Sequence, residues 1–333
     1  MLYKRFLDNT VTSGVDQAKA KEVRKRIFEC ESGKKLLLSP RDFIITNLGP
    51  GINSTSADYA PVVSENETLL VFTSRRPEGN LSKQKSTDGD YFEEVFFSRR
   101  QAGVWTPAQP IGPPVNTPFH NSNIALSADG RQLFLYTDSN EGDILLSEMV
   151  NGKWTQPKPL PFPVNTKDHE SSVAITSDGN KLFVASERAG GMGGSDIYLV
   201  EKNSAGQWSS AKNLGPSINT EWDDDSPFID YDGQALYFSS KGHNSIGGYD
   251  IFRSLLKGDA WTPAENLGLP INTTSNDSYF VSTADGARAY YSSVRSGGFG
   301  EEDIYMITLP AELVRDETPS VLKLNPGNER LYQ

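Results

Sequence analysis

The segment Leu214-Gly215-Pro216-Ser217-Ile218-Asn219 occurs in five versions along this chain of 333 residues. The other four versions end at Asn53, Asn116, Asn165 and Asn272, so the asparagines are 63, 49, 54 and 53 residues apart. Four tryptophans follow the same spacing: Trp105, Trp154, Trp208 and Trp261. Repeats of about 40 to 50 residues are typical of β-propeller blades, whereas helical solenoids repeat at shorter lengths and need a 3.6-residue hydrophobic period. The helical period is missing here, so the repeat predicts an all-β propeller.

Each repeat contains short β-branched and aromatic runs separated by turn residues, which predicts four strands, A to D. In the third repeat, strands A, B and C cover 172–176, 181–186 and 196–200, and strand D lies around 208–214. An Asp-Gly pair joins strands A and B in four repeats, where glycine supplies the positive φ of a tight hairpin. The first repeat has Glu65-Asn66-Glu67 instead, and an extra polar segment at 79–91, so its turn and its B-to-C loop are expected to differ.

The ring is expected to close through the N-terminal part of the chain. The last C strand, 303–308, is not followed by a D strand with a tryptophan, but residues 42–48 match the other D strands. An open ring would leave unpaired strand edges that favour aggregation. We therefore predict five four-stranded antiparallel blades, with this N-terminal strand completing the last one. The domain boundaries follow: a helical extension over 1–40, the propeller over 41–310, and a linker or tail over 311–333.

One amphipathic α-helix is predicted in the N-terminal extension. Ser13 and Asp16 form a capping box, and Gly33 is a stop signal. Between them, apolar residues recur at helical spacing: Val15, Ala18, Val23 and Ile27. The lone cysteine, Cys30, cannot form an internal disulfide, and we expect it to be a buried structural thiol.

Composition excludes several classes of partner. The net charge of −11 argues against nucleic acid and anionic membrane surfaces, because phosphate groups must be met by clustered lysine and arginine. No run approaches the 18 or more apolar residues of a membrane span. No signal peptide is recognisable, so an exported form would have lost its leader.

Candidate binding residues gather on one predicted face. In a propeller, the D-to-A and B-to-C connections open on one side of the ring, which we call the mouth face, and the A-to-B and C-to-D turns open on the other. Loops on a rigid scaffold often carry binding residues. The predicted partner-binding residues on the mouth face are Trp222, Asp223, Asp224, Asp225, His243, His169, Glu170, Arg75, Arg188, Lys241 and Arg295.

A structural interpretation competes with this one. Acids and bases that recur in every blade, such as Glu170 and Arg188, can form ion pairs between blades. The recurring Asp143, Asp196, Asp250 and Asp303 can cap the loop before strand C. Residues that break the repeat are therefore the better functional candidates: Trp222, the run from Asp223 to Asp225, His243 and the 79–91 loop. An exposed Trp222 beside carboxylates can anchor an interface, or it can plug the central funnel.

Two strings allow a resemblance to be named. Asp225-Ser226-Pro227-Phe228, followed by Asp232-Gly233 and by Gly247-Gly248-Tyr249-Asp250-Ile251-Phe252, resembles the WD40-like, TolB-type propeller repeat of Bacteroidota envelope proteins. Tyr59-Ala60-Pro61-Val62 and Phe72-Thr73-Ser74-Arg75-Arg76 resemble the propeller module of the OmpA-family envelope proteins of type IX secretion and gliding motility (PorE-like). The resemblance covers about residues 20 to 310.

The resemblance implies a non-catalytic scaffold for protein–protein interaction in the periplasm, associated with the outer membrane. Its partners would be envelope proteins of a secretion or gliding assembly. Peptidoglycan binding in that family depends on an OmpA-like domain that this sequence does not show, so cell-wall anchoring is not expected from these 333 residues.

The competing hypothesis is a carbohydrate-binding or glycoside-cleaving propeller, because five-bladed propellers also host glycosidases. Glycoside cleavage needs two carboxylates on opposite sides of a sugar, and no pair stands out from the repeats here. His120, His169 and His243 show no metal-binding spacing, and no serine nucleophile motif is present. No cofactor is predicted. Calcium at Asp223-Asp224-Asp225 is the one metal considered, since hard cations bind carboxylate oxygens.

Overall fold

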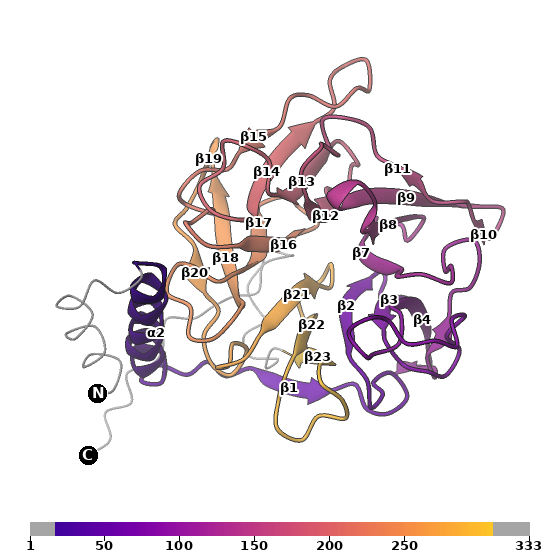
Figure 1. The fold of residues 1–333 in the computed structure, drawn as a ribbon, viewed down its shortest axis with the longest axis horizontal. Helices are drawn as coiled ribbons and strands as arrows, with labels where there is room; N and C mark the ends of the chain where they lie inside the picture. The colour runs from indigo at the N-terminus through magenta and orange to yellow at the C-terminus, as the bar shows by residue number, and fades with distance from the viewer. Residues whose placement is uncertain (1–16, 309–333) are drawn as a thin grey trace.

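The computed structural model describes residues 17–308 and shows a ring of five antiparallel sheets around a central axis (Figure 1). Blade 1 consists of β2 (Asp58–Val63), β3 (Leu69–Ser74), β4 (Glu94–Gln101), β5 (Val104–Trp105) and β6 (Gln109–Pro110). Blade 2 consists of β7 (Ser122–Leu126), β8 (Gln132–Thr137), β9 (Asp143–Val150), β10 (Lys153–Trp154) and β11 (Lys158–Pro159), with a 3-10 turn, η1 (Ser139–Glu141), between β8 and β9.

Blade 3 consists of β12 (Glu170–Ile175), β13 (Lys181–Ser186), β14 (Asp196–Glu201) and β15 (Lys212–Asn213). Blade 4 consists of β16 (Asp224–Ile229), β17 (Ala235–Ser240), β18 (Asp250–Lys257), β19 (Ala260–Trp261) and β20 (Glu265–Asn266). Blade 5 consists of β21 (Asp277–Ser282), β22 (Arg288–Ser293), β23 (Asp303–Thr308) and β1 (Ile44–Asn47). The predicted all-β, five-bladed propeller with one N-terminal helix is confirmed.

The outermost strand of most blades is interrupted, which the predicted four-stranded blades did not include. In blades 1, 2 and 4 the chain pairs as two short pieces, such as β5 and β6 on β4. Pro107, Pro157 and Pro263 lie between the pieces. Proline has no backbone N–H to donate to the ladder, so it interrupts the pairing at the outer edge of the sheet.

The ring closes as predicted. Strand β1 pairs antiparallel with β23, with Ile44 opposite Thr308 and Asn47 opposite Tyr305. Next to β1, Phe43 is buried in the same apolar cluster as Tyr237 of blade 4. In other blades a tryptophan packs on the preceding blade, as Trp105 does on Tyr290 with ring centroids 6.1 Å apart. Blade 5 has no such tryptophan within the described residues, and Phe43 fills the seam there.

The repeated asparagine joins neighbouring blades. Asn116, for example, accepts the N–H of Val95 at 3.0 Å and donates to the carbonyl of Val95 at 3.0 Å. The same two-sided contact recurs at the other four positions, pairing Asn53 with Ile304, Asn165 with Ile144, Asn219 with Ile197 and Asn272 with Ile251. Because both groups of the amide bond one residue of strand C, the segment that defined the repeat fixes the seam between blades.

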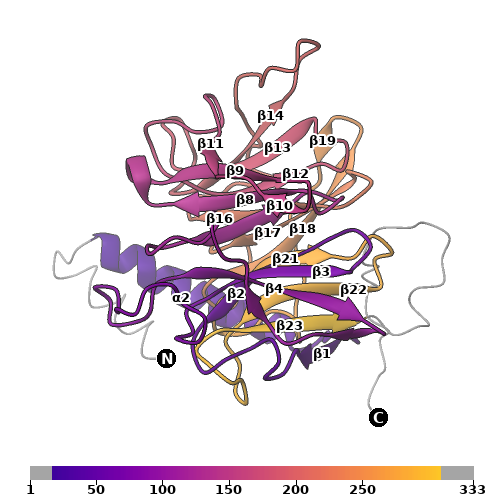
Figure 2. The same cartoon turned by 90° about the vertical axis from the view of Figure 1, so that its right-hand side faces the viewer.

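Helix α2 (Gln17–Leu36) lies beside blade 4 (Figures 1 and 2). The predicted stop at Gly33 is wrong, since the helix continues to Leu36 and ends before Pro40, whose ring disfavours helical geometry in the residue before it. Cys30 is exposed, so the expectation of a buried thiol is also wrong. The buried polar residues of this part of the helix are Glu29 and Ser32, and Glu29 bonds Lys25 and Arg26. The Ser13–Asp16 capping box and the 311–333 tail lie outside the described residues.

Within residues 17–308, no helix combines the length and the apolar character that crossing a membrane requires.

Candidate functional site

The acid at the start of strand A belongs to the blade itself in four blades. Asp224 accepts hydrogen bonds from the backbone N–H of Thr220 at 2.6 Å, from its hydroxyl at 3.0 Å, and from Ser240 Oγ at 2.5 Å. Burial raises the pKa of Asp224 to about 7. The equivalent residues, Asp58, Glu170 and Asp277, are bonded by the Ser or Thr four residues earlier in the same way. Glu170 and Asp224 are buried and therefore hold the D-to-A connection in place within their own blades.

In four blades an arginine or histidine side chain from the B-to-C loop is hydrogen-bonded to the D-to-A connection and so holds the two together. Arg188 donates to the carbonyls of Pro163 at 3.0 Å and Val164 at 2.8 Å, and its guanidinium lies 4.9 Å from the ring of Tyr198. We call such residues latch residues. They are Arg76 in blade 1, Arg188 in blade 3, His243 in blade 4 and Arg295 in blade 5.

The ion pairs that the latch residues form differ from the pairs expected between blades. Arg188 pairs with Glu170 at 3.3 Å and Arg76 pairs with Asp58 at 2.6 Å, so both pairs lie within one blade rather than between blades. His243 takes the arginine position in blade 4, with Nε2 2.8 Å from the Ile218 carbonyl and its ring 5.1 Å from Phe252. Burial lowers the pKa of His243, which favours its neutral form.

Trp222 is covered by the N-terminal helix. Lys21 Nζ lies 4.5 Å and Lys25 Nζ 5.3 Å from the centre of the Trp222 ring, and Lys21 also pairs with Glu221 at 2.9 Å. An ammonium over an indole face is attractive. Trp222 is therefore neither an exposed anchor nor a plug of the funnel, and instead holds α2 against blade 4.

The three adjacent aspartates do not converge. Asp223 pairs with Lys241 Nζ at 2.7 Å, Asp224 is bonded inside its blade, and Asp225 accepts hydrogen bonds from Ser171 Oγ at 2.6 Å and from Ser172. Successive residues of a strand face opposite sides, which separates Asp224 from Asp225 in β16. No group of three or more His, Cys, Asp or Glu side chains able to hold a metal is found in the part of the chain that the structure describes. The arrangement does not fit the calcium site considered from the sequence.

Arg75 and His169 also contact other residues of the mouth face. Arg75 donates to the Tyr91 carbonyl at 2.9 Å and to Asp88 at 2.5 Å, so it fastens the extra 79–91 loop. The His169 ring lies 5.7 Å from that of Tyr136. His120 holds the same blade position as His169 and lies 3.2 Å from Glu93.

Sequence reasoning missed a cluster of tyrosines and carboxylates at the axis, which we call the axial cluster: Tyr59, Glu93, Tyr136, Asp225, Tyr279 and Glu302. The rings of Tyr59 and Tyr279 are 6.0 Å apart, and the Tyr59 hydroxyl donates to Glu93. Burial raises the pKa of Tyr279, and the charges of Asp225, Glu302 and Glu93 raise it further. Burial also raises the pKa of Glu302 to about 7.

A sequence signal for this cluster was present. Glu93 and Glu302 directly precede the acids that begin strand C, Glu94 and Asp303, whereas blades 2 and 3 have Gly142 and Ser195 there. Both glutamates therefore break the repeat at a position that faces the axis.

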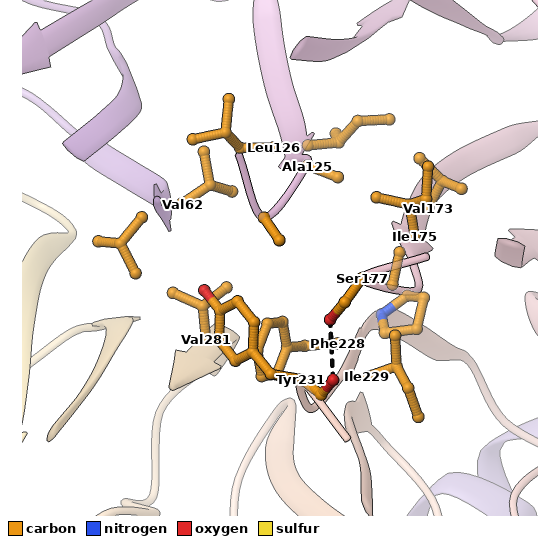
Figure 3. A pocket seen from close by; sticks show the side chains of 15 residues that line it. Val62, Ala125, Leu126, Val173, Ile175, Ser177, Phe228, Ile229, Tyr231 and Val281 are labelled. Carbon is orange, nitrogen blue, oxygen red and sulfur yellow. Dashed lines mark hydrogen bonds between the residues drawn. The ribbon is translucent and has the colours of Figure 1, made fainter. Parts of the chain in front are cut away.

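The other end of the axis is apolar and narrow. A cavity of about 40 Å³ lies among the inner strands of all five blades and is lined by residues such as Val62, Ala125, Val173, Phe228 and Val281 (Figure 3). Ser177 Oγ donates to the Tyr231 carbonyl at its edge at 2.9 Å. A space this small holds little more than one water molecule. The accessible polar part of the axis is thus the end at the mouth face.

Large apolar side chains are exposed in the loops of the mouth face. They are Leu81, Phe119, Phe162, Met192, Val294 and Phe299, all in D-to-A or B-to-C connections. Phe162 is 80% and Phe119 71% exposed. On the opposite face, among the described residues, the exposed large apolar side chains at the C-to-D hairpins are Val104 and Val150. Among the loops that connect strands within and between the blades, exposed large apolar side chains are therefore more numerous on the mouth face; Leu37 and Leu38, also exposed, lie between α2 and β1.

None of the protein-family models and none of the curated proteins compared with the sequence matches it. Similar solved structures exist at low identity. TolB from Acinetobacter baumannii is 15% identical over 78% of this chain, with a TM-score of 0.45, and the alignment spans 55% of that chain. The structure of BT0996 in an RGII complex is 8% identical over 85% of this chain and 96% of its own, with a TM-score of 0.52.

A third similar structure, alpha-L-arabinofuranosidase from Lactobacillus brevis, is 15% identical over 78% of this chain and 91% of its own, with a TM-score of 0.48. The neighbours thus include TolB and a glycoside-cleaving enzyme. At these identities the likeness concerns the propeller fold and leaves binding and catalysis open, since one fold hosts many functions.

Proposed function

We propose that this chain is a non-catalytic β-propeller scaffold that binds another protein through its mouth face, in the periplasm at the outer membrane. The sequence resemblance to type IX secretion and gliding-motility propellers supports placing the partner within such an assembly. The partner is then an envelope protein of that assembly. Any link to peptidoglycan would run through a further domain.

The observation that carries this proposal is the exposure of large apolar side chains on one face. Exposed apolar residues that gather on one side of a protein mark interaction surfaces more often than isolated ones do. Phe162 and Phe299 belong to blades 3 and 5, so a partner that covers both would span the mouth. The recurring charged residues are engaged within their own blades, which leaves these apolar side chains as the main free contacts.

The proposed interface differs from the one predicted from the sequence. Glu170, Asp224, Arg188, Arg295 and His243 stabilise the blades. Trp222 holds the helix. Asp223 and Lys241, which pair at 2.7 Å and remain partly exposed, stay as candidates for polar contacts at the rim.

The test is capture of envelope proteins by the intact chain and by a Phe162→Ser/Phe299→Ser double variant. The matched control is Val104→Ser/Val150→Ser, which removes the same kind of side chain from the opposite face. Loss of a defined partner with the mouth-face variant alone supports the proposal. Equal capture by all three proteins contradicts it.

The axial cluster favours glycoside binding or cleavage as a second candidate. Glu302 has a pKa raised to about 7, whereas Asp225 is hydrogen-bonded by two serines. Carboxyl groups in such unlike environments are what acid–base catalysis on sugars uses. Turnover or saturable binding of oligosaccharides that is lost in Glu302→Gln would favour this candidate. The absence of both in the wild-type protein would remove it.

A further inference from the structure

Blade 2 has no latch residue, although its backbone is arranged to carry one. Ser139 stands two residues after Thr137, the last residue of β8, as Arg188 stands two residues after Ser186 in blade 3. The Ser139 N–H points to Thr137 Oγ1 at 3.5 Å, and the Arg188 N–H donates to Ser186 Oγ at 3.1 Å. Ser139 therefore occupies the latch position with a side chain too short to reach the D-to-A connection.

The acid of strand A is also missing in this blade. Asn121 replaces it and keeps the same local contact, because Thr117 Oγ1 donates to Asn121 Oδ1 at 2.9 Å. In blades 1 and 3 the buried acid and the latch arginine balance each other's charge. Blade 2 has neither the acid of strand A nor the latch arginine, so both members of this ion pair are replaced together.

In blade 2, a cavity of about 520 Å³ lies on the mouth face at the position that the latch side chain fills in the other blades. Pro114 and Val115 line it, and they correspond to Pro163 and Val164, whose carbonyls the latch Arg188 binds. Among residues 17–308, no side chain donates a hydrogen bond to the carbonyls of Pro114 or Val115. Two acceptors that are occupied in blade 3 are therefore free in blade 2.

The floor and rim of the cavity suit a long side chain with a planar charged end. Leu135 and Leu145 form the floor, at the positions where blade 1 has Phe72 and Phe96 around Arg76. Asp138, an exposed carboxylate, and Phe119, 71% exposed, stand among the lining residues. Aliphatic walls accommodate the methylene stem of an arginine, and a carboxylate and carbonyl oxygens accept from its guanidinium.

We propose that this cavity binds an arginine side chain of the partner protein. The guanidinium donates to the carbonyls of Pro114 and Val115, as Arg188 does to the equivalent carbonyls of blade 3. Asp138 supplies the negative charge, and Phe119 covers the stem. We infer that the cavity prefers arginine because three of the other blades have an arginine as their latch residue. That the arginine belongs to a partner protein rests on the proposed function, whereas the chemistry of the cavity does not.

The test uses N-acetyl-L-arginine amide as the probe, with N-acetyl-L-lysine amide for comparison, and follows NMR signals of Leu135, Leu145 and Phe119. Saturable shifts with the arginine probe are expected, with binding more than about tenfold weaker for lysine, because an ammonium cannot make the planar two-pronged contact. Ser139→Arg should fill the cavity from within and weaken probe binding more than about tenfold. Gln207→Arg adds the same charge to the opposite face and should leave binding unchanged.

Three results would overturn the inference: no saturable shift with the arginine probe, equal affinity for both probes, or full binding in a Ser139→Arg variant that keeps its wild-type melting temperature. If Ser139→Arg unfolds, Phe119→Ser serves in its place, with a several-fold loss expected and unchanged affinity counting against the site. The Phe162→Ser/Phe299→Ser variant keeps the cavity intact. Probe binding without any partner capture would uphold the site and contradict the scaffold function.

Discussion

Asn53 and Ile304 are 251 residues apart in sequence and joined by two hydrogen bonds. Asn53 Oδ1 accepts the Ile304 N–H at 2.9 Å, and Asn53 Nδ2 donates to the Ile304 carbonyl at 3.0 Å. This contact links the first approach segment to the last C strand, next to the β1–β23 pairing. The seam between blades 5 and 1, where the ring closes, is therefore built like the other four.

Replacing Asn53 with alanine should weaken this closure. The change leaves the buried N–H and carbonyl of Ile304 without side-chain partners, and each unsatisfied group costs about 1 to 3 kcal/mol. We expect the free energy of unfolding in urea to fall by about 2 to 4 kcal/mol. Asn219→Ala, which removes the same contact to Ile197, should cost a similar amount. A loss below about 0.5 kcal/mol, typical of a surface substitution, would contradict the role assigned to Asn53.

Phe43 should be equally important at the same seam. It is 9% exposed and fills the position that tryptophans hold in other blades, so Phe43→Ala should destabilise the fold by about 3 kcal/mol. Ile44, its neighbour, is 56% exposed, and Ile44→Ala should cost under about 0.5 kcal/mol. Thermal unfolding of the two variants measures the difference. Similar melting temperatures would show that Phe43 is not part of the closure.

The fold could be predicted from the sequence because the pattern of one blade recurs five times. Asn53 and its four counterparts recur with the blades, and the missing fifth tryptophan located the closing strand. The interrupted outer strands were missed, although Pro107, Pro157 and Pro263 were visible. The helix end was misplaced because a glycine inside a helix costs only about 1 kcal/mol, too little to stop it at Gly33.

The site was harder to predict, because a charged residue does not reveal which groups already bind it. Arg188 looks available in the sequence, yet two backbone carbonyls 24 and 25 residues away hold its guanidinium. The sequence did not identify His243 as a latch residue, because it stands three residues after the end of its B strand, whereas the latch arginines stand two residues after theirs. Trp222 is covered by Lys21, from a helix 200 residues earlier, which no local pattern indicates.

Trp222→Ala should release helix α2 without opening the propeller. It removes the ring beneath Lys21 and Lys25, contacts that contribute about 0.5 to 1 kcal/mol each at exposed sites. Hydrogen exchange followed by mass spectrometry should show several-fold faster exchange in 17–36 and unchanged exchange in the blades. Phe28→Ala, at a half-exposed position on the same helix, is the control. Unchanged exchange of α2 in Trp222→Ala would mean that other contacts hold the helix.

Stability should depend on pH through Asp230. Burial, together with the nearby Asp232, raises the pKa of its carboxyl to about 7, whereas the same carboxyl in an unfolded chain has a pKa of about 3.9. The folded state thus keeps a proton that the unfolded state loses, so this group lowers stability as the pH rises from about 4 to 7.

Asp230→Asn removes this penalty and keeps an oxygen for the N–H groups of Gln234 and Ala235, which donate at 2.8 and 2.9 Å. The variant should therefore gain stability relative to the wild type between pH 5 and pH 8. Urea unfolding at both values measures the gain. A difference that stays constant with pH, or shrinks toward pH 8, would show that Asp230 is ionised in the folded protein.

Site-specific photo-crosslinking in the native host tests the scaffold function most directly. A photoreactive residue is placed at Phe162 or Phe299 on the mouth face, and at Val104 or Val150 on the opposite face. We predict crosslinks to one envelope protein of defined mass from both mouth-face positions and none from the opposite face. Crosslinks of equal yield from both faces, or none from Phe162 and Phe299, would contradict the proposed interface.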